Sequence, residues 1–170
     1  MILPSSLTWF PIMRVEYINP FVKALTTTFS TMLNCTATRG QLRLKQDVYP
    51  PCEISGVIGL SGKAVGTVVV SLSREVAVKA ASAMLMMELT EIDSDVIDAV
   101  GEIANMVAGS AKAELAQFEL SISLPSVITG RGHEVRFPSN VTPICVPFDT
   151  EWGQLNLEVG LEEVAVPCAV

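Results

Sequence analysis

The chain has 170 residues, of which 49% are hydrophobic and 17% are charged. These values exclude an intrinsically disordered chain and fit one globular domain that is large enough to bury a core. The formal net charge of −7 argues against a broad basic surface for nucleic acid and better suits a protein partner with a basic patch.

The chain begins with an apolar run, MILPSSLTWFPI (1–12), that has no basic residues and is too short to span a bilayer. A second methionine, Met13, follows it. We therefore expect residues 1–12 to be a disordered lead or an upstream start, residues 13–165 to form a single domain, and residues 166–170 to be a tail. We expect no membrane insertion.

The first half of this domain predicts a helix followed by strands. The run INPFVKALTTTFSTMLN (18–34) favours a helix that Asn19 caps, because a proline suits its first turn and apolar residues recur every four positions. An alternating run at 41–48 predicts a strand. The runs at 53–60 and 64–72 predict a hairpin around the turn sequence SGK.

The second half predicts more helix and then more strand. We expect a helix over 73–87, with Ser73 as its N-cap. Near its end, Met84, Met86 and Met87 fill either the core or a subunit interface, and the core is the preferred interpretation. A polar break leads into a long helix from about Ser94 to Gln117. Three extended runs then close the chain, at 120–128, 142–148 and 153–161.

The two halves share a pattern. Gly66 and Gly153 each open an alternating strand of a hairpin, and they are 87 positions apart. The same shift carries the first helix onto the long helix. These features predict an α+β fold, in which a tandem helix-plus-three-strand repeat forms an antiparallel sheet with helices packed on it. The alternative is that antiparallel hairpins resemble one another without a duplication.

The long helix contains the run DAVGEIANMVAG (98–109), in which one face is unusual. Asp98, Glu102, Asn105 and Gly109 are four, three and four residues apart, so they share one side of the helix. The opposite side carries an ordinary core stripe, which consists of Val100, Ile103 and Val107.

Stability alone does not favour this outer face. The amide of Asn105 competes for backbone hydrogen bonds, and a glycine such as Gly109 costs about 1 kcal/mol relative to alanine inside a helix. Residues that disfavour the local secondary structure often occur at functional sites. The pattern therefore indicates a docking face with two projecting polar groups. The alternative is an accidental polar face in which the glycine accommodates a packed neighbour.

The same residues resemble the signature helix of the CheC, CheX and FliY family of chemotaxis phosphatases. That signature is an acidic residue or Ser, three residues, Glu, two residues and Asn, which Asp98, Glu102 and Asn105 match. The resemblance extends to four further runs and covers about Val15 to Leu161. The runs are YINPF (17–21), the SG…G hairpin, PSVITGRGHEV (125–135) and PFDTEWGQLNLEV (147–159).

The number of signature helices separates the branches of this family. CheX-like members have one and CheC-like members have two, so this chain resembles the CheX-like branch. Glu16 and Asn19 mimic the pattern at the first helix. We discount them because Glu16 precedes the helix and Asn19 lies at its cap.

The resemblance implies a CheC-like fold with a long exposed active-site helix. It implies hydrolysis of the aspartyl phosphate on a phosphorylated CheY-type receiver domain, with Asn105 positioning the attacking water and Glu102 contacting the receiver's active-site lysine. Asp98 and Gly109 would bind the partner, although a plain solvated role for Asp98 and simple helix packing for Gly109 stay open. The resemblance also implies a homodimer and a Mg²⁺ ion that belongs to the receiver.

A non-catalytic adaptor that docks a receiver or a flagellar-switch protein is the alternative function. The intact pair of Glu102 and Asn105 argues against it, because a pure adaptor has no need of the amide.

The remaining chemistry-bearing residues are scattered. The four cysteines lie far apart and form no CxxC pair, and His133 is the one histidine. We therefore expect reduced, mostly buried thiols in a cytoplasmic protein, with no metal site and no cofactor of its own. The run TGRGH (129–133) lacks the GK[ST] of a Walker loop and is interpreted as a hairpin turn.

Overall fold

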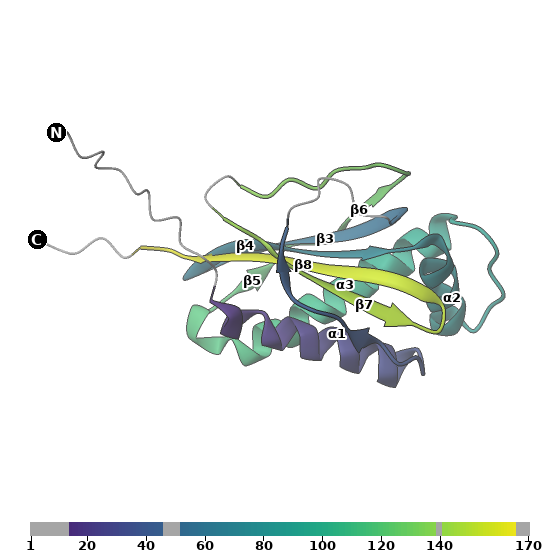
Figure 1. Ribbon diagram of the computed structural model, residues 1–170, viewed down its shortest axis with the longest axis horizontal. Coiled ribbons are helices and arrows are strands. Elements are labelled where there is room, and N and C mark those ends of the chain that lie inside the picture. The colour runs from purple at the N-terminus through teal and green to yellow at the C-terminus, as the bar shows by residue number, and fades with distance from the viewer. Residues whose placement is uncertain (1–13, 46–51, 139–140, 166–170) are drawn as a thin grey trace, which may run out of the picture.

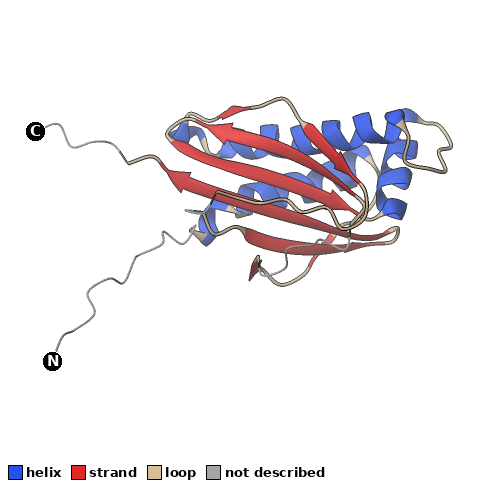
Figure 2. Ribbon diagram, turned by 90° about the horizontal axis from the view of Figure 1, so that it is seen from above, coloured by secondary structure: helices blue, strands red, loops and turns tan. Residues whose placement is uncertain are grey.

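The computed structural model describes residues 14–45, 52–138 and 141–165. The predictions for residues 1–12 and 166–170 lie outside the described residues and stay predictions. Figure 1 shows a twisted sheet with helices beneath it, and Figure 2 shows from above that the helices lie behind one face of the strands.

The described helices follow the predicted order. They are the 3₁₀ turn η1 (Val15–Tyr17), α1 (Asn19–Met32), α2 (Arg74–Leu85), α3 (Ser94–Glu114) and the 3₁₀ turn η2 (Ala116–Phe118). The described strands are β1 (Thr38–Arg39), β2 (Arg43–Leu44), β3 (Ile54–Ser61), β4 (Ala64–Leu72), β5 (Ser121–Ile122), β6 (Ser126–Thr129), β7 (Ile144–Thr150) and β8 (Gly153–Glu163).

The strands form one antiparallel sheet in the order β1-β7-β8-β4-β3-β5, with β2 also on β7 and β6 also on β3. Two hairpins, β3–β4 and β7–β8, meet along the long β4–β8 pair. Each hairpin is flanked by short strands from the other half of the chain. This arrangement confirms the predicted α+β fold, and the helix-plus-strands order recurs in both halves as the repeat predicts.

The core lies between the sheet and the helices. The predicted core stripe of α3, Val100, Ile103 and Val107, is fully buried. It packs in one cluster with residues of α1 such as Phe21 and Phe29 and with alternate residues of the sheet. Full burial of one such side chain stabilises the fold by about 1.5–3 kcal/mol.

A glycine on β3 determines how closely α3 approaches the sheet. A Cβ atom placed on Gly56 would lie 2.7 Å from Cβ of Ala104 and 3.1 Å from the carbonyl oxygen of Val100. The backbones of α3 and β3 therefore meet without a side chain between them. This contact fixes the buried side of α3 and leaves its opposite side facing outward.

The other face of the sheet is also covered, by the segment after β6. A Cβ atom on Gly160 would lie 2.5 Å from Cγ1 of Val141 and 2.8 Å from Cδ1 of Phe137, so this segment rests on the bare backbone of β8. Beneath the segment, Lys45 Nζ pairs with Glu158 Oε2 at 2.7 Å. In the described residues, no buried side-chain nitrogen or oxygen lacks a hydrogen-bond partner.

Helix caps show where local prediction succeeds and fails. Ser73 caps α2 as predicted, because its side chain accepts a hydrogen bond from the Val76 amide at 3.3 Å. The prediction for Asn19 is wrong: Ile18 occupies the cap position, and Asn19 is the first residue of α1. The preceding turn η1 already directs the chain into the helix, so no side-chain cap forms.

The predicted strand over 120–128 is interrupted. β5 and β6 both pair with β3, but Ser123, Leu124 and Pro125 lie between them and do not pair as a strand. Proline has no N–H to donate to a ladder. Ser123 is still held against β3, because its N–H donates to the Gly59 carbonyl oxygen at 2.9 Å and its side chain accepts a hydrogen bond from the Gly59 amide at 2.9 Å. Of the strand predicted at 41–48, the described part contains β2 alone.

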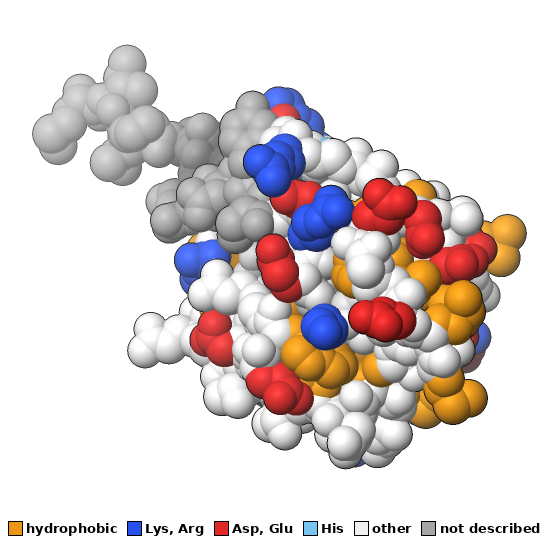
Figure 3. Space-filling view, turned by 90° about the vertical axis from the view of Figure 1, so that its right-hand side faces the viewer, with side chains coloured by type: hydrophobic (Ala, Val, Ile, Leu, Met, Phe, Trp, Pro, Cys, Tyr) orange, Lys and Arg blue, Asp and Glu red, His pale blue; other side chains and the backbone are white. Residues whose placement is uncertain are grey.

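Two methionines at the end of α2 point to solvent and not into the core. Met86 adopts a left-handed conformation with φ of 52°, which turns the chain outward. Met86 is 91% exposed and Met87 is 53% exposed, so the prediction that these two fill the core is wrong, whereas Met84 is partly buried and packs against the core. Figure 3 views this end of the molecule and shows hydrophobic side chains gathered along one side of it, beside acidic ones.

The helices in the described residues are too short or too polar for a membrane span.

We predict that Gly56→Ala destabilises the fold by about 1–3 kcal/mol, because the added methyl group overpacks against α3. Urea unfolding followed by circular dichroism measures the change. Gly59→Ala is the matched control on the same strand, since its Cβ would meet Ser123 Oγ at an ordinary 3.5 Å. Equal stability of the two variants would contradict the proposed contact between β3 and α3.

Candidate active site

The helix α3 is held from both ends and on both flanks. Asp93 caps its start by accepting a hydrogen bond from the Val96 amide at 3.0 Å. On one flank, Glu114 pairs with Lys23 of α1 at 2.6 Å. On the other flank, a Cβ atom on Gly101 would lie 3.6 Å from Pro125, so the edge formed by β5 and β6 runs beside α3. The outer stripe lies between these flanks.

The structure places all four predicted residues on this outer stripe. Asp98 and Glu102 are exposed, and Asn105 and Gly109 are partly exposed. Glu102 and Asn105 are one turn apart, which puts their Cβ atoms about 5–6 Å from each other. Their side chains can therefore act on one small group of a docked molecule.

The polar side chains of the stripe have no bonding partner in the part of the chain that the structure describes. Within the described residues, Asp98, Glu102 and Asn105 make no side-chain hydrogen bond and no ion pair. Since no described side-chain nitrogen or oxygen is both buried and unpartnered, the amide of Asn105 reaches solvent. A carboxylate and a carboxamide thus stand side by side with their hydrogen-bonding capacity unused.

Gly109 has no packing reason to be a glycine. The nearest atom to a Cβ built on it is Cδ1 of Ile122, at 4.0 Å, which is ordinary van der Waals distance. Alanine would fit here and would stabilise the helix by about 1 kcal/mol. The alternative that Gly109 accommodates a packed neighbour of its own chain is therefore wrong, in contrast to Gly56.

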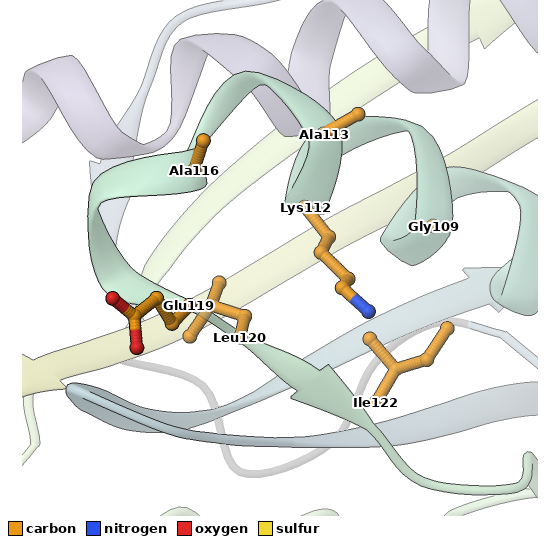
Figure 4. Close-up of a pocket in the computed structure, with 7 residues that line it drawn as sticks. All are labelled: Gly109, Lys112, Ala113, Ala116, Glu119, Leu120 and Ile122. Atoms are coloured by element: carbon orange, nitrogen blue, oxygen red, sulfur yellow. The ribbon is translucent and has the colours of Figure 1, made fainter.

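A groove opens at Gly109 and continues the stripe toward the end of the helix. Its volume is about 400 Å³. Figure 4 shows that one wall comes from α3 and η2 and the other from β5 and the residues before it. The lining residues are Gly109, Lys112, Ala113, Ala116, Glu119, Leu120 and Ile122.

Sequence reasoning missed this groove. From the sequence, Lys112 lies on the same stripe, three residues after Gly109, and is interpreted as a solvated helix end. Ala116, seven residues after Gly109, continues the spacing, and that signal could have extended the face. Ile122 comes from β5 and Leu120 directly precedes that strand, so no local pattern connects them with the helix.

The other sequence candidates do not form a second site. Glu16 lies in η1, before α1, and so does not share an α-helix with Asn19. His133 lies on the far face of the sheet, where Nε2 is 2.7 Å from Ser55 Oγ and Nδ1 is 2.7 Å from the Gly130 carbonyl oxygen. Both ring nitrogens are therefore occupied within the chain. The TGRGH run follows β6 as a turn, but no strand follows it directly, so the hairpin interpretation is wrong.

The described cysteines are buried and form no disulfide. Burial raises the pKa of the Cys52 thiol to about 12, and burial also raises the pKa of the Cys35 and Cys145 thiols. These thiols are thus protonated at neutral pH and are poor nucleophiles. Cys168 lies outside the described residues. In the part of the chain that the structure describes, no group of three or more metal-ligating side chains comes together.

Comparisons with known proteins show the family and the fold of the chain. The family described as "Chemotaxis phosphatase CheX" matches residues 54–149. A curated relative, the CheY-P phosphatase CheX of Thermotoga maritima, is 28% identical over 127 residues, which are 73% of this chain and 82% of the relative.

Solved structures share the whole fold. A CheC-like superfamily protein from Shewanella sp. PV-4 superposes with a TM-score of 0.82 at 31% identity, over 88% of this chain and 99% of its own. A CheX–CheY–BeF₃–Mg²⁺ complex from Borrelia burgdorferi contains the same fold, with a TM-score of 0.76 at 23% identity, over 88% of this chain and 100% of that chain.

The antiparallel sheet with helices packed on one face, together with the likeness to a solved CheC-like superfamily protein, defines a protein of the CheC-like class. The family match spans more than half of the chain, so it identifies the family within this class. The chain belongs to the chemotaxis phosphatase CheX family.

We predict that Asn105→Ala leaves the fold intact and raises its stability by up to about 0.7 kcal/mol, because alanine is the better helix former and no contact is lost. Asn156→Ala is the matched control. Asn156 is 6% exposed and donates to Cys52 Sγ at 3.9 Å, so we expect a loss of about 1–3 kcal/mol. Chemical unfolding of both variants measures the difference, and a destabilised Asn105→Ala variant would mean that the amide serves the fold.

Proposed function

We propose that this chain hydrolyses the aspartyl phosphate of a CheY-type receiver domain. The observation that carries the proposal is the free pair of Glu102 and Asn105 on the exposed stripe of α3. The similarity to the CheY-P phosphatase CheX of Thermotoga maritima supports it. In this role α3 inserts its outer stripe into the phosphorylated pocket of the receiver.

The chemistry requires little from the phosphatase. In an acyl phosphate, the bond between phosphorus and the aspartyl oxygen breaks as the oxygen of a water molecule bonds to phosphorus. The aspartate leaves as a carboxylate, which is a good leaving group, and the proton of the water passes to the phosphate product or to solvent. The transition state of phosphoryl transfer is loose, so no strong base is needed. What the reaction needs is a water molecule in line with the bond that breaks.

Asn105 meets this need. Its carboxamide can accept a hydrogen bond from a water molecule and donate one to it, which fixes the orientation of that water. Correct placement of a nucleophile accounts for several kcal/mol of a reaction barrier. The rigid helix supports this role, because α3 is capped and packed along its buried side.

Glu102 and Asp98 serve the docking. In this mechanism Glu102, one turn before Asn105, contacts the receiver lysine that otherwise pairs with the phosphoryl group. A charge-assisted hydrogen bond of this kind fixes the register of the two proteins. Asp98 is exposed one turn further out and extends the contact. The Mg²⁺ ion at the phosphoryl group belongs to the receiver.

The proposal also includes a cytoplasmic location, where receiver domains work, and a homodimer, as the family resemblance implies.

We predict that sedimentation velocity gives about twice the mass of one chain. A single species with the mass of one chain would remove the dimer from the account without affecting the phosphatase.

We predict that Asn105→Ala lowers the catalysed rate of receiver dephosphorylation by about a hundredfold or more, because the water loses its orientation. The lifetime of the phosphorylated receiver, measured with and without the variant, gives the rate. Asp98→Ala is the control on the same stripe, for which we expect a weaker effect on binding and none on the bound rate. Undiminished acceleration by Asn105→Ala would end this mechanism. Tight binding by the wild-type chain with no change in phosphate lifetime would instead indicate an adaptor.

A further inference from the structure

The groove at Gly109 lies within reach of any receiver that covers the pair of Glu102 and Asn105. Gly109 is four residues beyond Asn105 on the same stripe, which is about 6 Å along the helix axis. A standard interface covers about 800 Å² on each partner, a patch about 30 Å across. A receiver centred on the pair therefore covers the groove as well.

The floor of the groove is apolar, its helix side carries small residues, and the charged residues Lys112 and Glu119 stand at its edges, where Glu119 is paired with Lys63. Leu120 is 3% exposed, Ile122 is partly buried, and the helix side offers Gly109, Ala113 and Ala116. Figure 4 shows these short side chains around the open space. A small pocket with an apolar floor beside a docking face has the form of a pocket that an anchoring side chain of a partner fills.

Lys112 adds a charge at the rim. Figure 4 shows its side chain extending from α3 toward Ile122. Lys23 and Lys63 are each paired with a glutamate, whereas Lys112 has no ion pair or side-chain hydrogen bond within the described residues. It is the positive member of a stripe whose other charges, Asp98 and Glu102, are negative. A partner that matches this stripe presents a basic group at one end and an acidic group at the other.

We propose that the groove at Gly109 receives an apolar side chain of the docked receiver domain and that Lys112 pairs with a receiver carboxylate at its rim. The inference rests on the proposed function and adds the part of the surface that selects the partner. Gly109 and Lys112 are positioning residues in this account, since neither touches the reacting atoms. Gly109 keeps the groove open. This role explains why a glycine occurs inside the helix although it lowers the stability of the helix.

Two variants and two matched controls test this inference. Gly109→Leu fills the groove, and Ser110→Leu places the same side chain on the next residue, which faces α1 rather than β5. Lys112→Glu reverses the rim charge, and Lys79→Glu makes the same change at an exposed lysine of α2. Binding to a CheY-type receiver loaded with beryllofluoride and Mg²⁺ gives Kd, and steady-state phosphate release gives KM and kcat.

We expect Gly109→Leu and Lys112→Glu to raise Kd and KM by about tenfold or more, with kcat within about twofold of wild type and with both controls unchanged. The effect of Lys112→Glu should shrink at high salt, whereas that of Gly109→Leu should not. Gly109→Leu should also raise the unfolding midpoint, because leucine is the better helix former, so that lost binding cannot be attributed to misfolding.

Wild-type affinity for both variants, or a fall in kcat at unchanged KM, would contradict the proposed role of the groove. The proposed phosphatase activity would not be affected by either result. If the wild-type chain neither binds nor dephosphorylates any receiver, the proposed function fails and the groove inference fails with it. The two failures are thus distinguishable in one set of measurements.

Discussion

The contact between α3 and β3 at Gly56 is the constraint on which the site depends. Because Val100 and Ala104 rest on a bare backbone, the helix cannot rotate about its axis without driving side chains into the strand. The side opposite this contact must then face solvent. Asp98, Glu102, Asn105 and Gly109 occupy that side, so the orientation of the site is set by packing beneath it.

The polar side chains of the stripe are available to a partner because they make no side-chain hydrogen bond or ion pair within the described residues. Elsewhere in the described residues, polar groups in protected positions find partners, as Ser55 does with Ser71 at 2.7 Å and Lys45 with Glu158. On the outer stripe of α3, Asp98, Glu102 and Asn105 have no partner among the described residues, and no described side chain fills the space at Gly109. The buried polar atoms of this fold are paired, so the unpaired polar groups of the stripe stand out. Such groups are available to form hydrogen bonds with a second protein.

Much of this could be predicted from the sequence, because the decisive features are local. The period of α3 separates its buried stripe from its outer stripe without any knowledge of the sheet, and the alternating runs gave both hairpins. The break at Pro125 could have been predicted, because proline cannot donate to a ladder. The outward turn at Met86 and the absence of a cap at Asn19 depend on contacts or turns that propensity does not encode. The groove could not be predicted, since it forms where Gly109 meets Ile122 of another element.

The central claim is that the position of the Asn105 amide, and not merely its presence, accelerates hydrolysis. The most direct test is the single-turnover rate of dephosphorylation in a preformed complex with Asn105→Gln, which keeps the amide but moves it by one methylene group. The account predicts wild-type binding and a rate close to that of the receiver alone. A rate equal to that of the wild-type complex would contradict it, because the water would then not depend on where the amide stands.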